Sequence, residues 1–350
     1  MSTANIRETR IAVAFRHQAD IATLPAAANF LSLSKTNAVL ATVDPKTEDD
    51  SQDLGKGDEF ANNVFPVNQD ASAPYEKFAS SEILAYLAVF GLGNAVKTSP
   101  DTGAFLYTCT PMDPVASGIE LPYTAYIETI RQGGSALLDR ALVGCVVSDW
   151  GLDLNSGPGR QNAKVKFTLM GSGIVTQPSG VTLPTEYVEH GLNAGSAAIT
   201  ILGSNYVSLK RIVSLSFGWA SNVRDAQGLY PGSGVNSAGF QTRGRLENGD
   251  RVPTCTFKTR LESSSTELAN LLAQTEGTAV FSLTGALITG TTYHSTVFTF
   301  PRVRISAAVV DDDQGIVTVS VTLRGLKHPT DGILTVAATC AQDNIGSAAV

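Results

Sequence analysis

The sequence predicts a mainly β protein: an antiparallel β-sandwich or barrel-like domain with a flanking short α-helix, plus an irregular N-terminal region with one helix. Charged residues make up only 16% of the 350 residues, against about 25% in ordinary soluble domains. Short segments alternate between apolar and hydroxyl-bearing residues, as strands with one buried face do. Long glycine-rich connections separate these segments, which is typical of sheets joined by loops.

The first 75 residues predict an N-terminal arm with an acidic loop. A short strand is expected over 38–43. From Asp44 to Glu59 the sequence carries seven acidic residues against two lysines, a charge density that a packed core does not tolerate. We therefore expect 44–59 to be a solvated loop, and residues 76–120 to be a helical and otherwise irregular connector.

Residues 121–340 predict a β-rich domain, which a short tail over 341–350 follows. Alternation is clearest in 165–169 and 317–323, where Val, Phe or Leu alternates with Lys, Ser or Thr. This pattern is typical of antiparallel strands that are buried on one face. The strands expected in this domain are 123–130, 141–154, 163–170, 197–202, 207–223, 251–262, 278–287, 295–310, 316–326 and 333–339.

The last long strands predict a hairpin whose turn is 311–315. Asp311, Asp312 and Asp313 crowd this turn, and Asp311-x-Asp313 matches the opening spacing of a calcium-binding loop. The twelfth position of such a loop would be Thr322, inside a strand, instead of a bidentate glutamate. A solvated hairpin tip is therefore the better interpretation.

Two short helices are expected. Ser80 or Ser81 can cap a helix that continues over 82–91, where glycines end it. Ser264 and Glu267 match a capping box ahead of three leucines. Those leucines form one apolar stripe, so we expect this second helix to lie against a sheet.

Composition argues against several classes of protein. The net charge is −7 and the 25 basic residues are scattered, whereas a protein that grips nucleic acid clusters its Lys and Arg. The four cysteines form no CxxC pair, so we expect buried thiols in a reducing compartment. The N-terminus does not match a secretory signal, and no apolar run predicts a membrane span.

The sequence contains few motifs that are typical of catalysis. The four histidines lie at least 34 residues apart, and no G-x-S-x-G motif occurs. We therefore interpret each histidine as a surface or strand residue. Asp149 and Asp153 flank Trp150 and could form the paired carboxylates of a glycosidase, but only two tryptophans are available for a sugar cleft. We predict no catalytic residue, no metal site and no cofactor.

Six features follow one another in a characteristic order over residues 75–340. They are the helix Glu82–Gly91, the strand ALVGCVVSDWGLDL, the turn Gly157-Pro158-Gly159, a strand ending Met170-Gly-Ser-Gly, the segment KRIVSLSFGWASNV before a long loop, and the final hairpin FPRVRISAAVV…GIVTVSVTLRGL. This order resembles that of bacteriophage tail tube proteins, also called major tail proteins.

The resemblance implies a structural, non-enzymatic subunit of the virion tail that assembles in the host cytoplasm. Its copies would close into rings, expected to be hexameric, and the rings would stack into a hollow tube for DNA ejection. Other tail proteins, such as the tape measure and the tail terminator, would be its partners. DNA would pass through without specific binding, and no membrane contact is expected.

The resemblance also suggests where contacts lie. Two long loops are candidates for contacts between rings, represented by Asp49 and Asp50 in one and by Tyr230 and Phe240 in the other. The acids of the 311–315 turn are candidates for the lumen or for a solvated hairpin tip.

Two alternative classes stay open at this point. Another virion shell component, a capsid or decoration protein, would share the low charge, although a capsid fold asks for a long spine helix. A carbohydrate-binding or carbohydrate-hydrolysing β protein would ask for clustered aromatic residues, and only 7% of the chain is aromatic.

Overall fold

We describe the fold from a computed structural model of the chain. The described residues are 8–18, 20–34, 39–51, 60–61, 63–113, 120–132, 135–155, 163–177, 183, 189–193, 197–206, 212–225, 241–242, 246–247, 249–263, 265–313 and 315–347.

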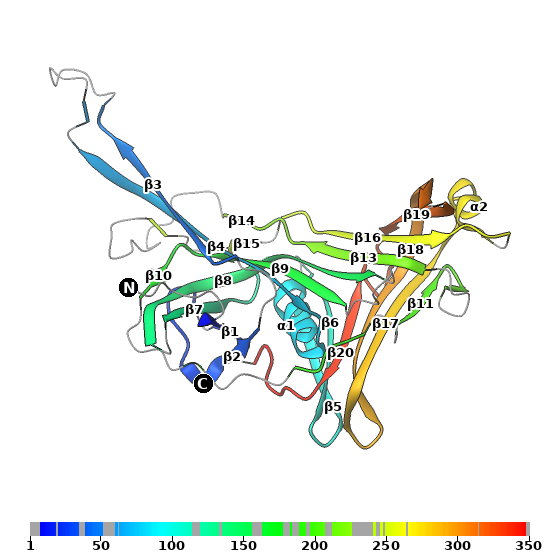
Figure 1. Cartoon of the computed structure of the whole chain (residues 1–350), viewed down its shortest axis with the longest axis horizontal. Helices are drawn as coiled ribbons and strands as arrows, with labels where there is room; N and C mark the ends of the chain where they lie inside the picture. Colours follow the sequence, from blue (N-terminus) through cyan, green and yellow to red (C-terminus); the bar gives the residue numbers. More distant parts are fainter. Residues whose placement is uncertain are drawn as a thin grey trace.

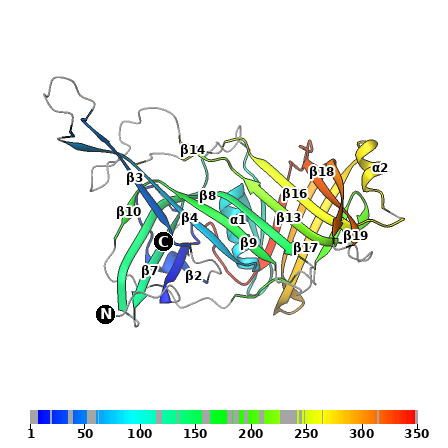
Figure 2. The ribbon, with the colours of Figure 1, turned by 45° about the horizontal axis from the view of Figure 1, so that its top comes forward.

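The strands form three antiparallel sheets joined by two long strands (Figures 1 and 2). Sheet 1 runs through β3 (Thr42–Asp49), β4 (Val64–Phe78), β9 (Lys164–Gly171), the second half of β8 (Ser135–Asn155), β13 (Ile212–Ala220), β16 (Val252–Arg260), β19 (Ile316–Gly325) and the second half of β18 (Thr292–Asp313).

Sheets 2 and 3 share β18 and β8 with sheet 1. Sheet 2 runs through β5 (Gly93–Asp101), β6 (Ala104–Pro111), β20 (Thr335–Cys340), the first half of β18, β17 (Glu276–Thr289), β11 (Ala198–Ile201) and β12 (Ser204–Asn205). Sheet 3 runs through β2 (Phe30–Leu33), β1 (Arg10–Ala14), β7 (Thr124–Gln132), the first half of β8 and β10 (Val175–Thr176). A short pair, β14 (Arg224–Asp225) and β15 (Leu246–Glu247), and one 3-10 turn, η2 (Ala27–Asn29), complete the described elements.

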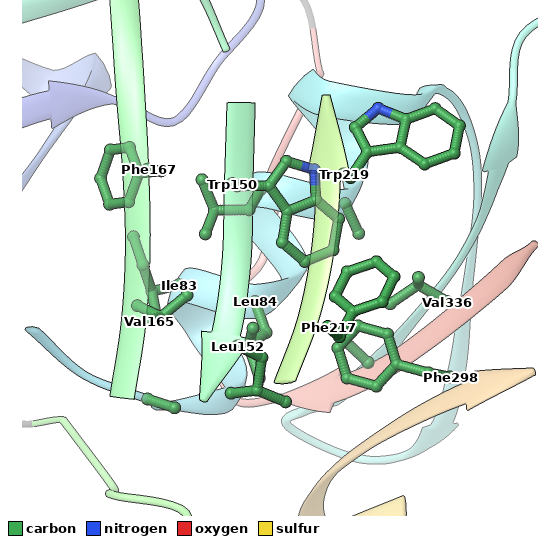
Figure 3. Close-up of a cluster of buried hydrophobic side chains, with 14 of the residues drawn as sticks. Ile83, Leu84, Trp150, Leu152, Val165, Phe167, Phe217, Trp219, Phe298 and Val336 are labelled. Carbon is green, nitrogen blue, oxygen red and sulfur yellow. The ribbon is translucent and has the colours of Figure 1, made fainter. Parts of the chain in front are cut away.

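Sheets 1 and 2 pack face to face across an aromatic core (Figure 3). The rings of Trp150 and Phe217 in sheet 1 lie 5.1 Å apart between centroids, and Phe217 lies 4.9 Å from Phe298 in sheet 2. Each of the three is at most 2% exposed, and burying such a side chain contributes roughly 1.5–3 kcal/mol. The predicted antiparallel sandwich is confirmed.

Helix α1 (Ser81–Leu92) belongs to the core, because every one of its residues is buried. Its predicted ends are confirmed: Ser80 Oγ accepts a hydrogen bond from Ile83 N at 3.4 Å, and Gly93 adopts a left-handed φ of 86°. Gly91 lets the helix approach Trp150 closely, since a Cβ there would lie 2.7 Å from the indole nitrogen. Among the helices that the structure describes, none is long and apolar enough to cross a membrane.

The N-terminal region contains more strand than predicted. Residues 42–49 form β3, which continues through Asp44 and Pro45 where a loop was expected, because β4 supplies a full antiparallel partner. Pro45 is tolerated since β3 is an edge strand, where a missing N–H leaves no bond unmade. Within the expected irregular connector, β5 and β6 form a hairpin.

Two further boundaries differ from the prediction. β18 continues to Asp313, which pairs with Ile316, so the hairpin turn is shorter than 311–315. Helix α2 (Glu267–Leu272) begins later than the capping box predicted, with Thr266 at the N-cap and no side-chain cap bond. Ser264 lies outside the described residues.

Candidate assembly surfaces

A two-stranded arm projects from the body of the protein at the upper left of Figure 1. It consists of β3 and the first half of β4 with the segment that joins them. Val64 and Phe65 of β4 are 62% and 53% exposed, and Phe60 of the joining segment is 70% exposed. An isolated pair of strands is marginally stable in water. The arm therefore presents apolar surface where folding within one chain gives it little support.

The predicted contact residues Asp49 and Asp50 lie on this arm. Asp49 is the last residue of β3 and accepts a hydrogen bond from Ser51 N at 2.9 Å. Asp50 bridges to the other strand, where Asn63 N donates to its carboxylate at 3.2 Å. Both acids are therefore hydrogen-bonded at the outer end of the arm.

The second predicted contact loop is mostly outside the described residues, and so are Tyr230 and Phe240. Its described end lies against the arm: Gln241 N donates to Val67 O at 2.9 Å, and Gln241 bridges to Asn68. The described end of the second segment therefore lies beside β4, the strand that pairs with β3.

The tip of the β18–β19 hairpin holds Asp311, Asp312 and Asp313. Asp313 forms an ion pair with Lys258 at 3.0 Å, and the Asp311 carboxylate accepts a bond from the Asp312 backbone. Among the described residues, no group of three His, Cys, Asp or Glu side chains could hold a metal ion. These acids lie at the end of β18, next to the turn of the β18–β19 hairpin.

The same end of the molecule exposes apolar side chains beside those acids. Leu272 of α2 is 85% exposed, and its neighbour Leu268 is 38% exposed. The predicted apolar stripe therefore covers the sheet only through Leu271, which packs against the core. The further exposed apolar residues on the hairpin are Val309, Val310, Ile316 and Val317.

The outward face of sheet 1 is charged. Antiparallel register places side by side the outward residues of β4, β9, β8, β13, β16, β19 and β18. Some are paired across strands: Lys164 with Glu76 at 3.4 Å and Lys166 with Asp153 at 3.4 Å. The charged residues of this face are Glu76, Asp149, Asp153, Lys164, Lys166, Lys258, Arg260, Arg304, Asp311, Asp313 and Arg324.

The outward face of sheet 2 carries no charge over the three described rows that cross it. Residues in register across neighbouring strands share a face, and these rows alternate with buried residues such as Tyr107, Phe298 and Val336. The rows are Thr98–Leu106–Thr339–Ser295–Thr284, then Val96–Thr108–Ala337–Val297–Ser282–Ala198, then Asn94–Thr110 and Thr335–Thr299–Val280–Thr200. We call this surface the neutral face.

Several strands lie at the edges of the sheets, and three of them are β3, β5 and β12. Among the described residues, β3 pairs only with β4, β5 only with β6, and β12 only with β11. Strand β5 is almost wholly exposed along its length. Open edges of this kind leave backbone N–H and C=O groups available for a strand of another chain.

Sequence reasoning missed one buried polar cluster. His294 of β18 lies between two residues of α1: its Nδ1 is 2.7 Å from Ser81 Oγ and 3.1 Å from Glu82 Oε1. The ring of His190 stacks beside it, with centroids 4.5 Å apart. The interpretation of His294 as a surface or strand residue was incomplete, because its side chain is only 1% exposed. No local motif could show a contact between residues 213 apart.

This Ser–His–Glu cluster is structural. A nucleophilic triad needs the acid and the hydroxyl on different nitrogens of the imidazole, whereas Ser81 and Glu82 share Nδ1 here. Burial raises the pKa of the Glu82 carboxyl, but the hydrogen bonds from His294, from its own backbone and from Ser80 outweigh burial, and the net effect is a lowered pKa. The cluster therefore ties the start of α1 to sheet 2.

The glycosidase hypothesis is not supported by geometry. Asp149 and Asp153 share the outward face of β8, as their spacing predicted, but four extended residues separate them by about 13 Å, beyond the roughly 5–9.5 Å of paired catalytic carboxylates. Each is bonded to a neighbour: Asp149 to Thr168 at 3.2 Å and Asp153 to Ser216 at 2.7 Å. Trp150 points into the core instead of a cleft.

The cysteines match the expectation of buried thiols. Cys109, Cys145, Cys255 and Cys340 are all free and buried, and burial raises the pKa of each to about 12. Since the thiolate is the reactive form, the native thiols are poor targets for labelling reagents.

A charge-poor β-sandwich with open edges and a projecting apolar arm is typical of a structural subunit that assembles with other chains. Comparison with known families agrees: a family described as phage tail tube protein matches residues 9–325. The chain belongs to the phage tail tube protein family, a structural family that self-assembles into the tube of the virion tail. No curated protein matches the chain.

Proposed function

We propose that copies of this chain close into rings, with six as the expected number, and that the rings stack into the hollow conduit through which DNA leaves the virion. The arm is the observation that supports stacking most strongly. Its exposed Val64 and Phe65 and its marginal two-stranded ribbon would gain stability from a further surface, and a neighbouring copy supplies one.

Ring closure and stacking use different parts of the chain in this proposal. Open edges such as β5 and β12 are suited to contacts within a ring, because pairing with a neighbour satisfies their backbone groups. The arm, with Asp49 and Asp50, and the segment 225–249, whose described residue Gln241 contacts β4, are suited to contacts between rings. The tape measure and the tail terminator would meet the tube in its lumen and at its end.

Electron microscopy of the purified chain over a concentration series tests the proposal. We expect uniform rings and hollow tubes of constant diameter, because heterologous contacts that close under rotation give rings. A chain that stays monomeric at every concentration, even when seeded with preformed tube fragments, would contradict it.

A triple variant, Phe60→Ser, Val64→Ser and Phe65→Ser, tests the role of the arm. We expect a folded subunit, with a free energy of unfolding within about 1 kcal/mol of the parent because these sites are exposed, that forms rings but no long tubes. Phe78→Ser is the matched control, since Phe78 lies on the same strand and is 45% exposed but sits on the body. Tubes of normal length from the triple variant would contradict stacking by the arm.

A further inference from the structure

The two outward faces of the sandwich differ in charge, and this difference bears on which of them meets DNA. The sheet 1 face carries six Lys and Arg side chains, among them Arg260, Arg304 and Arg324. Cations along a DNA path release condensed counterions and hold the phosphates in place. The face also carries five acids, three of which pair with its lysines, so a conduit lined by it would present DNA phosphates with fixed charges of both signs.

The neutral face carries no such fixed charges. Its seventeen residues include no Lys, Arg, Asp, Glu or His across β5, β6, β20, β18, β17 and β11. Charged side chains begin only at its margins, where Arg302 pairs with Glu276 at 2.8 Å and where Asp101 forms the β5–β6 turn. Phosphates that slide along these rows meet neither attraction nor repulsion from a fixed charge.

The neutral face is also too polar for the centre of a protein contact. Eleven of its seventeen side chains are Ser, Thr or Asn, and the six apolar residues, such as Ala337 and Val297, are interspersed among them. Each hydroxyl or amide buried under another copy would need a hydrogen-bond partner there. Contact with water satisfies all of them, and a water-filled lumen provides it.

We propose that the neutral face of sheet 2 lines the lumen of the tube and that DNA passes along its threonine rows. This inference rests on the proposed function, since it requires a tube. The exposed acids and valines at the β18–β19 tip then lie away from the middle of the lumen wall. Thr108 lies at the centre of the face, where its register neighbours are Val96 and Ala337.

Cysteine labelling of assembled tubes tests the assignment. Thr108→Cys and Thr299→Cys place a thiol on the neutral face, and Thr322→Cys is the matched control on the sheet 1 face. Each tube is treated with a small maleimide and with a maleimide on a polymer too large to enter. The four native thiols are buried, so they add little background.

We expect both neutral-face thiols to react with the small maleimide and to resist the large one, except near tube ends. The control thiol on the sheet 1 face, which does not line the lumen in this proposal, should not show that combination. Protection from both reagents would mean that another copy covers the face, and reaction with the large reagent would place it outside the tube; either result overturns the inference. So would failure of both neutral-face variants to assemble when the control assembles. Absence of tubes from the parent chain would instead overturn the proposed function, and this inference with it.

Discussion

The outward faces of sheets 1 and 2 belong to one sandwich and share one core, yet they differ completely in charge. On sheet 1, positions such as Lys166 and Asp153 form ion pairs across strands. On sheet 2, the corresponding outward positions hold Thr, Ser, Val and Ala. Folding alone does not require this difference, since both inward faces bury the same kinds of aromatic and aliphatic residues. The difference therefore reflects what each face meets after folding.

Truncating a core side chain that contacts both sheets has the largest expected effect on stability. Phe298→Ala takes away the sheet 2 ring that packs on both Trp150 and Phe217. We expect a loss of about 3–5 kcal/mol in the free energy of unfolding, because the transfer free energy is lost and a cavity remains. Urea unfolding of the purified subunit measures it. A loss below about 1 kcal/mol would contradict a core common to both sheets.

A substitution in the buried cluster of Ser81, Glu82 and His294, between α1 and sheet 2, has the second largest expected effect on stability. Glu82→Gln removes a carboxylate whose pKa lies below the ordinary 4.5, and we expect a loss of about 1–3 kcal/mol at neutral pH because the hydrogen bonds of His294 and Ser80 weaken. A lowered folded-state pKa contributes stability above about pH 4.5, which is lost as the pH falls through the folded value.

Thermal unfolding between pH 7 and pH 3 measures the stability that the ionised Glu82 carboxylate contributes. The parent chain should lose stability more steeply below about pH 4.5 than Glu82→Gln does. Parallel pH profiles would show that Glu82 is not the group responsible.

Adding a positive charge to the neutral face tests whether DNA contacts this face and not the sheet 1 face. Thr108→Arg should make assembled tubes retain DNA in a salt-dependent way, with the slope of log K against log salt steeper by about 0.9 for each phosphate contacted. Thr322→Arg, which adds the same charge to the sheet 1 face, should not. DNA retention by filter binding of tubes, over a salt series, measures both, and equal slopes would refute the distinction.

Breaking a pair on the charged face has the smallest expected effect. Lys164→Met leaves Glu76 without its 3.4 Å partner, but both side chains are partly exposed. We expect a change of about 0.2–1 kcal/mol in the free energy of unfolding and unchanged DNA release. A double-mutant cycle with Glu76→Gln gives the coupling energy, and a value well above 1 kcal/mol would show that these ion pairs support the fold.

The sequence predicted the parts of the fold that have local signals. Apolar alternation located most strands of residues 121–340, and the capping serine with the following glycine located α1. The same logic failed for β3 and β5, because both are exposed edge strands without a buried face. Their pairing with β4 and β6 supplies what their own residues do not indicate.

The candidate surfaces were less predictable than the fold. The sequence predicts Asp49 and Asp50 in a loop, and the structure places them at the outer end of the projecting arm. The neutral face has no signature in the linear sequence, because its residues, which range from Asn94 to Thr339, form rows only once the strand register is known. The Ser81–His294 contact is hidden for the same reason.

Electron cryo-microscopy of assembled tubes, at a resolution that traces the strands, is the measurement that tests the account most directly. We predict that sheet 2 lines the lumen with its Thr108 and Val297 rows facing the axis, and that the arm of each copy lies on the next ring. A lumen lined by the charged face of sheet 1, or an arm that touches no neighbouring ring, would contradict the account.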